Sequence, residues 1–171
     1  MKPAGQWKLS LWGVFMMLVG CEAEPPSPAV GVQLTEIALP QLDGDSLRLG
    51  EFQGKVLVLN FWATWCAPCR EEMPALQALS ARLDQDRYRV IGVSVDQDLN
   101  LVREFVLKYE IDFLQLTDSS MAVASDVLGV SAFPQTLIVD PQGRVQNSII
   151  GSQAWNDPAY FQPLLQAAEG G

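Results

Sequence analysis

One stretch limits the possible folds of this chain more than any other. Residues 55–62, KVLVLNFW, are almost continuously apolar, which is the signature of a strand buried on both faces of a central sheet. A helical pattern follows over residues 67–83, and Cys66 and Cys69 stand at its start. A buried strand that leads through a short connection into a helix predicts an α/β fold in which the cysteine pair opens that helix.

The rest of the chain alternates between strand and helix patterns. Two short alternating runs around Asp43 and Gly44 predict an N-terminal β-hairpin. Further strands are predicted at residues 88–95, 112–118, 136–140 and 144–150. Further helices are predicted at residues 101–109, at 119–130 with a stop near Gly129, and at 158–170 after an Asp157 N-cap. The order predicts a central sheet with helices on both faces.

Composition limits the chemistry that the chain can perform. It has 171 residues, of which 49% are hydrophobic, so we expect one globular domain over residues 33–171. A net charge of −9 without a basic cluster argues against nucleic acid as a partner. The chain has no histidine, which excludes imidazole metal sites and Cys–His or Ser–His catalysis. Two close thiols cannot complete a zinc site, so we expect no metal and no cofactor other than a redox-active disulfide.

The N-terminal segment has the pattern of an export signal. A basic start precedes residues 9–20, an apolar run shorter than the roughly 20 residues that span a bilayer. The run ends in LVGC, which resembles the bacterial lipoprotein box, and this predicts a signal peptide over residues 1–20 and a lipidated Cys21. An uncleaved anchor and an ordinary cleaved signal are the alternatives. The proline-rich residues 21–32 are predicted to form an extended tether to a bacterial membrane, outside the cytoplasm.

If Cys21 carries lipid, Cys66 and Cys69 have only each other to pair with. Export also places them where disulfides form and persist. A helix start favours the thiolate, so we expect Cys66 to be the accessible nucleophile of low pKa. Cys69, one turn deeper, would then resolve the mixed disulfide, and Pro68 presets the first turn. The alternative is a structural staple, although so short a loop removes little entropy from the unfolded chain.

Glu72 is a second candidate for the chemistry. At 100° per residue it falls at about 260°, inside the apolar stripe that leucines form at about 240–300°. A carboxylate on a buried face is costly without a role, and we expect Glu72 to take and return the proton of Cys69, with burial raising its pKa. The alternative is that a kink at Pro74 turns Glu72 to solvent, where it is an ordinary first-turn acid.

Pro134 lies directly before the predicted strand at residues 136–140. A cis bond at this position would leave a backbone edge open to an extended client segment. A trans proline that ends a loop is an equal alternative from the sequence.

With these residues identified, the chain resembles the thioredoxin superfamily, and within it the membrane-tethered branch of TlpA, ResA and CcmG-type proteins. The resemblance covers nearly all of the domain and is carried by GKVLVLNFWATWCAPCREEMP and VSAFPQTLIVDPQGRV. It implies a thioredoxin-like fold with a central mixed sheet, and an inserted helix and strand at about residues 100–117.

The resemblance also assigns residue roles. Cys66 would be the nucleophile, Cys69 the resolving thiol and Glu72 the buried acid of the reductases. Pro134 would be cis, and the backbone of Phe133 would contact the client. We expect Trp65, Ala67, Pro68, Phe133 and Pro134 to form the client-binding surface. Gln135 stands where the branch commonly has threonine, and this departure leaves the partner preference open.

The sequence therefore predicts a lipid-anchored, extracytoplasmic thiol–disulfide oxidoreductase that acts as a reductant. The resemblance implies clients such as apocytochrome c or a copper-site protein, and a membrane electron donor of the DsbD or CcdA type. A disulfide-introducing oxidant and a non-catalytic lipoprotein that binds a partner are the alternatives, because the Ala67–Pro68 dipeptide does not fix the direction of electron flow.

Overall fold

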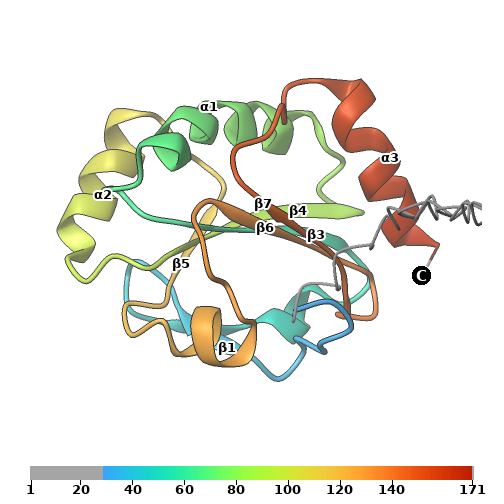
Figure 1. Ribbon diagram of the computed structural model, residues 1–171, viewed down its shortest axis with the longest axis horizontal. Helices are drawn as coiled ribbons and strands as arrows, with labels where there is room; N and C mark the ends of the chain where they lie inside the picture. The colour runs from blue at the N-terminus through green and yellow to red at the C-terminus, as the bar shows by residue number, and fades with distance from the viewer. Residues whose placement is uncertain (1–28, 171) are drawn as a thin grey trace, which may run out of the picture.

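The protein is described by a computed structural model covering residues 29–170, and its centre is a five-stranded mixed sheet (Figure 1). The strands lie in the order β5-β4-β3-β6-β7; β3 pairs with β4, and β4 with β5, in parallel, whereas β6 and β7 run antiparallel to their neighbours. The strand bounds are β3 Val56–Trp62, β4 Tyr88–Ser94, β5 Leu114–Thr117, β6 Gln135–Val139 and β7 Val145–Ile150. All five predicted strands are confirmed.

Three α-helices cover one face of this sheet: α1 Ala67–Arg82, α2 Leu99–Lys108 and α3 Pro158–Glu169 (Figure 1). The connections from β3 through α1 to β4, and from β4 through α2 to β5, step across the sheet in the same direction. Because such crossovers are right-handed, both place their helix on the same side. The predicted cap of the last helix is confirmed, since the Asp157 carboxylate accepts from the Ala159 N–H at 2.9 Å.

Short elements cover the opposite face (Figure 1). They are the hairpin strands β1 Ala38–Pro40 and β2 Ser46–Arg48, the 3₁₀ turn η1 Leu49–Phe52 and the π-helix η2 Ala122–Val127. Helices therefore lie on both faces as predicted, with the long ones on one side. The hairpin turns at Gly44, whose φ of +102° favours glycine. The predicted stop of η2 is also present, because Gly129 has a φ of +62°.

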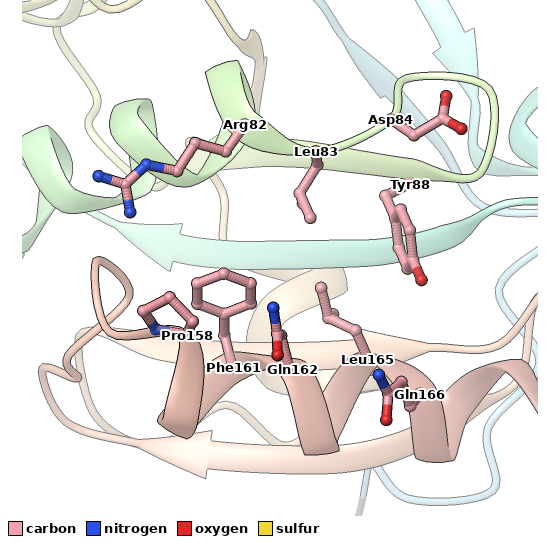
Figure 2. A pocket seen from close by; sticks show the side chains of 9 residues that line it. All are labelled: Arg82, Leu83, Asp84, Tyr88, Pro158, Phe161, Gln162, Leu165 and Gln166. Carbon is pink, nitrogen blue, oxygen red and sulfur yellow. The ribbon is translucent and has the colours of Figure 1, made fainter.

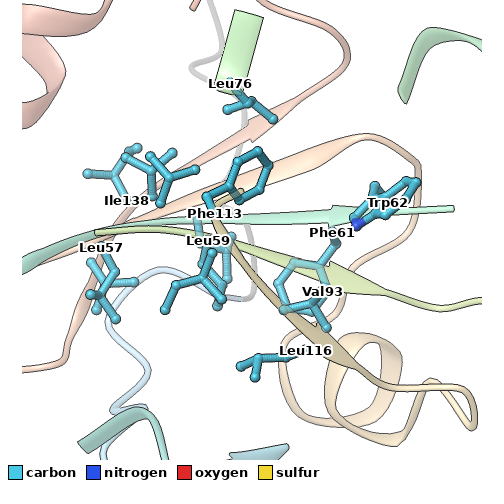
Figure 3. Packing of buried hydrophobic residues seen from close by; sticks show 14 of the residues in the cluster. Leu57, Leu59, Phe61, Trp62, Leu76, Val93, Phe113, Leu116 and Ile138 are labelled. Carbon is cyan, nitrogen blue, oxygen red and sulfur yellow. The ribbon is translucent and has the colours of Figure 1, made fainter. Parts of the chain in front are cut away.

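Strand β3 is buried along its whole length, which is why its sequence reads as one apolar run. Leu57, Leu59 and Phe61 point to the side of the hairpin, away from Leu76 of α1 (Figure 3). Trp62 points to the helical side and packs against Phe105 of α2, with ring centroids 5.1 Å apart. The strand thus holds the two layers together and ends where the cysteine pair begins.

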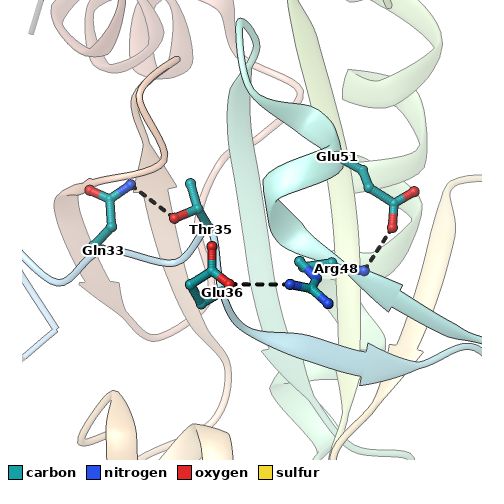
Figure 4. Close-up of polar contacts among 5 residues, drawn as sticks. All are labelled: Gln33, Thr35, Glu36, Arg48 and Glu51. Atoms are coloured by element: carbon teal, nitrogen blue, oxygen red, sulfur yellow. Dashed lines mark hydrogen bonds and ion pairs between the residues drawn. The ribbon is translucent and has the colours of Figure 1, made fainter.

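The N-terminal strands are fastened by local polar contacts (Figure 4). The Arg48 backbone N–H donates to Glu51 at 3.0 Å, and the Arg48 guanidinium pairs with Glu36 at 3.2 Å. The ion pair is exposed to solvent, so it contributes little to stability. The side chain of Gln33 donates to the carbonyl of Gln142 at 2.6 Å, and this contact joins the N-terminal segment to the turn before β7.

The start of the folded unit differs from the prediction. Residues 29–32 were assigned to the tether, but Ala29 is fully buried and the Gly31 N–H donates to the Val145 carbonyl at 2.8 Å. Backbone hydrogen bonds to β7 hold this stretch without any side-chain period, so residues 29–32 belong to the folded unit. The predicted signal peptide, Cys21 and the rest of the tether lie outside the described residues. Within residues 29–170, no helix has the length and apolar character needed to cross a membrane.

Gly92 of β4 offers a test of this packing. A Cβ there would lie 2.3 Å from Oε1 of Gln115, which accepts from the Trp62 indole N–H at 3.0 Å. We expect Gly92→Ala to displace the Gln115 amide and to lower the free energy of unfolding by about 1–3 kcal/mol in urea titrations.

The control is Gln115→Ala, which removes the obstacle. In the Gln115→Ala background, Gly92→Ala should cause little further decrease in the free energy of unfolding. An equal loss in both backgrounds would show that the contact does not limit residue 92.

Candidate active site

The two cysteines form a disulfide at the start of α1. Their sulfurs are 2.12 Å apart and their Cα atoms 5.3 Å apart. Cys66 is the N-cap of the helix, and its sulfur accepts from the Cys69 backbone N–H at 3.3 Å. Pro68 lies in the first turn, where a missing N–H is tolerated. A sulfur that accepts from the open end of a helix is the one in which negative charge is stabilised.

The two sulfurs differ in exposure, although less than the sequence suggested. In the disulfide form Cys66 is 7% exposed and Cys69 is fully buried. The order agrees with a nucleophile above a resolving thiol. Cys66 is recessed rather than openly accessible, while its neighbours Trp65, Ala67 and Pro68 are exposed around it.

Asp96 fixes the loop that delivers Cys66. Its buried carboxylate accepts from the Thr64 backbone N–H at 2.9 Å, from the Thr64 hydroxyl at 2.6 Å and from the Ser94 hydroxyl at 2.8 Å. Sequence analysis did not identify this residue. A signal was present, because Asp96 follows a buried strand, and the ends of neighbouring parallel strands meet at one edge of a sheet.

The predicted client-binding residues come together at the same edge. Phe61 near the end of β3 is paired in register with Gln135 at the start of β6, so the loops beyond them are neighbours. Trp65, 64% exposed, meets the half-buried Phe133 edge to face with ring centroids 5.8 Å apart. The Phe133–Pro134 peptide bond is cis. These residues surround the cysteine pair with an apolar, partly aromatic rim.

Gln135 does not belong to this rim. It is 1% exposed, its amide oxygen accepts from the Ser131 N–H at 3.4 Å, and its amide nitrogen donates to the Ser148 hydroxyl at 2.9 Å. The side chain folds inward and ties the Pro134 loop to β7, so it is not part of the surface that a client would meet.

Glu72 is buried on the inner face of α1, with 3% of its surface exposed. The alternative in which it faces solvent is excluded, because α1 continues through Pro74 and keeps Glu72 on the face of Cys69. Its Oε1 accepts from the Asn60 amide at 2.7 Å, and its Oε2 accepts from the Gln153 N–H at 3.0 Å and the Trp155 indole at 3.2 Å. Burial raises the pKa of Glu72, and these hydrogen bonds oppose the rise.

Three partners of Glu72 escaped sequence analysis. Asn60 was visible as the one polar residue in the apolar run at residues 55–62, a position where a buried amide needs a partner. Gln153 and Trp155 lie in the connection from β7 to α3, which carries no periodic pattern. No feature of the sequence indicated that this connection folds back over α1.

A hollow of about 380 Å³ lies elsewhere, between the C-terminal end of α1 and α3 (Figure 2). Arg82 and Leu83 line one side, and Phe161 and Leu165 line the other. Arg82 is 16 residues from Cys66 along α1, roughly 24 Å at 1.5 Å per residue. The hollow therefore has no part in the chemistry of the cysteine pair.

Comparisons with known proteins agree with this geometry. A family model described as the AhpC/TSA family matches residues 30–148. The chain is 29% identical over 139 residues to the thiol-disulfide oxidoreductase ResA of Bacillus thuringiensis (strain Al Hakam), covering 81% of this chain and 80% of that protein. It is 35% identical over 125 residues to the thioredoxin-like protein YneN of Bacillus subtilis (strain 168), covering 71% and 72%. A putative thiol:disulfide interchange protein DsbE from Chlorobium tepidum has a similar structure, with a TM-score of 0.71, 26% identity, and coverage of 81% and 97%.

The cap geometry of Cys66 can be tested by stability. We expect the free energy of unfolding of Cys66→Ser to exceed that of Cys66→Ala by about 1 kcal/mol, because a serine hydroxyl can accept from the Cys69 N–H that Cys66 now caps. Both variants lack the disulfide, so urea titration isolates the cap.

The matched control is residue 69, which caps nothing and is fully buried. There Cys69→Ser should be no more stable than Cys69→Ala, since a buried hydroxyl without a partner is unfavourable. Equal stability of the two residue-66 variants would contradict the assignment of the cap.

Proposed function

This chain belongs to the AhpC/TSA family and is a thiol–disulfide oxidoreductase, and on that premise we propose that it acts as a membrane-tethered reductant of partner-protein disulfides outside the cytoplasm. The observation that carries the proposal is the order in which three groups follow one another from the surface into the core at the start of α1. Cys66 caps the helix, Cys69 lies beneath it, and Glu72 is buried one turn further along.

The reaction is a pair of exchanges between sulfurs. The Cys66 thiolate attacks one sulfur of a client disulfide, and the other client sulfur leaves as a thiolate. Glu72 accepts the proton of Cys69, whose thiolate attacks Cys66 in the mixed disulfide. The Cys66–Cys69 bond forms, the second client sulfur leaves, and two electrons have passed to the client. The proton held by Glu72 is then available to a departing thiolate.

The charges at the site support the proposed direction of electron flow. A strongly oxidising pair is one whose reduced thiolate is stabilised. Here a carboxylate, not a cation, lies in the buried layer beside Cys69, and a neighbouring negative charge disfavours a second one. The site therefore stabilises the reduced form less than an oxidant requires, which supports a dithiol donor.

The export signal and the family resemblance support the proposed location and partners. A lipidated Cys21 would hold the domain at a bacterial membrane, and a donor of the DsbD or CcdA type would return electrons to the pair. Clients would be extracytoplasmic proteins with a disulfide to be opened, such as apocytochrome c or a copper-site protein. The rim around the cysteine pair would bind these clients. It consists of the exposed Trp65, Ala67 and Pro68, the half-buried Phe133 and the buried Pro134.

A trapping experiment tests the reaction and names the clients. Cys69→Ala leaves the mixed disulfide on Cys66 without a resolving thiol, so covalent partners should accumulate in cells and be identified by mass spectrometry. The Cys66→Ala, Cys69→Ala double variant is the matched control and should trap nothing.

The reduction potential decides the direction. We expect a value nearer to about −270 mV than to about −120 mV, and a value at the oxidising end would overturn the reductant role. Complementation of a deletion strain by the double variant would instead favour a non-catalytic binding protein.

Glu72→Gln should separate stability from activity. In the disulfide form the raised pKa of Glu72 makes the wild-type protein most stable below the unfolded value of 4.5, and this stability is lost as pH rises through the folded pKa. The variant lacks the buried charge, so at neutral pH it should be more stable than wild type in urea titrations. The difference should disappear at acid pH.

The same variant should resolve mixed disulfides more slowly, by about a hundredfold, because Cys69 has lost its proton acceptor. Its rate should also lose the pH dependence that Glu72 gives the wild type. An unchanged pH profile would show that Glu72 has no part in proton transfer.

A further inference from the structure

The two oxygens of Glu72 have different kinds of partner. Oε2 accepts from two N–H groups, the backbone of Gln153 at 3.0 Å and the indole of Trp155 at 3.2 Å. Oε1 accepts from the side-chain amide of Asn60 at 2.7 Å, and the Ser152 side chain also hydrogen-bonds to the carboxylate. The carboxylate is thus held from two sides by parts of the chain that are 12 to 83 residues away.

We propose that Trp155 is a positioning residue for the exchange reaction: its indole N–H, together with the Gln153 N–H, holds Oε2 of Glu72 so that the carboxylate stays ionised beneath Cys69 and takes up the thiol proton on Oε1. This inference rests on the proposed role of Glu72 as the proton acceptor of Cys69. It assigns a function to the connection from β7 to α3, which the family comparison does not reach.

The nature of the donors favours Oε1 as the oxygen that carries the proton. A backbone N–H and an indole N–H can only donate, so a proton on Oε2 would face both of these donors. Oε1 faces the side-chain amide of Asn60, which has both a donor nitrogen and an acceptor oxygen. Oδ1 of Asn60 is buried and has no hydrogen-bond partner within the described residues. A half-turn of that amide brings Oδ1 to Oε1, and the Thr136 hydroxyl, now an acceptor at 2.9 Å, can donate to the turned amide.

The groups near Glu72 explain why its ionisation needs these hydrogen-bond donors. Two acidic groups lie near Glu72 within residues 29–170: Cys69, a thiol in the reduced form, on the same buried face of α1, and the phenol of Tyr160 on α3. The pKa of Tyr160 is raised by burial and by the charge of Glu72. Both groups are acids, so neither supplies a positive charge to the carboxylate. Ionisation of Glu72 therefore depends on hydrogen-bond donors, and Trp155 is one of the two N–H groups that donate to Oε2.

The connection that carries Trp155 is held firmly enough for this role. Trp155 is fully buried, and its ring meets Tyr160 edge to face at 5.5 Å. The Gly151 N–H donates to the Pro134 carbonyl at 2.8 Å, and Arg82 at the end of α1 donates to the Asn156 carbonyl at 3.1 Å. The segment is thus joined at one end to the client-binding loop and at the other to α1.

The test is Trp155→Phe in the full chain, reduced, with Trp62→Phe as the matched control. Both substitutions remove one buried indole N–H and keep an aromatic ring, but the Trp62 indole donates to the neutral amide of Gln115. The carboxyl ¹³C resonance of Glu72 reports its titration directly. We expect Trp155→Phe to raise the midpoint by about one pH unit, a tenfold change in proton affinity, and Trp62→Phe to leave it unchanged.

The pH profile of exchange should move by the same amount and in the same direction. An unshifted Glu72 midpoint in Trp155→Phe, or an equal shift in both variants, would overturn the proposal. If Glu72→Gln abolishes the pH dependence but Trp155→Phe leaves it in place, only the role of Trp155 fails. If Glu72→Gln leaves the profile intact, the proposed role of Glu72 itself fails.

A measurement on the wild-type protein keeps the test independent of folding. The indole ¹H–¹⁵N signal of Trp155 should titrate with the midpoint of Glu72, because the indole hydrogen bond weakens when the Glu72 carboxylate is protonated. The indole signal of Trp62 should not follow that midpoint. A Trp155 signal that is indifferent to the Glu72 titration would contradict the proposal even if Trp155→Phe did not fold.

Discussion

The burial of one carboxylate beneath a reactive thiol is the condition that the rest of this structure must satisfy. An ionised group loses its hydration on burial, and it remains ionisable only if the protein supplies donors in place of water. Glu72 receives them from Asn60 in the central strand and from Gln153 and Trp155 in a distant connection. The sheet, the helix and the C-terminal connection must therefore all be in place before the proton acceptor exists.

The sheet also brings the nucleophile and its client surface to one edge. Strand β3 delivers Cys66 to the start of α1, and the neighbouring strand end supplies Asp96, which fixes Thr64 in the intervening loop. On its other side β3 pairs with β6, and this places the Pro134 loop beside the cysteines. One strand with two different neighbours thus positions the thiolate, the loop that aims it and the surface that receives a client.

The sequence predicted the features that depend on near neighbours. The buried strand, the helix start at the cysteine pair and the inward face of Glu72 follow from apolar runs and helical periodicity, and all three are present in the structure. Features that depend on long-range packing were missed or misread. Trp155 contacts Glu72 from 83 residues away, and Gln135 turns its side chain inward to meet Ser148 of β7. Neither choice is encoded by a local pattern.

The proton-handling residues are buried, whereas the client-binding residues form the exposed or half-buried rim around Cys66. Substitution at Trp65 or Phe133 can therefore change the fit to a client without altering the donors of Glu72. The two parts are joined by a backbone hydrogen bond, which the Gly151 N–H donates to the Pro134 carbonyl. A client that displaces the Pro134 loop would pull on the segment that holds Oε2 of Glu72.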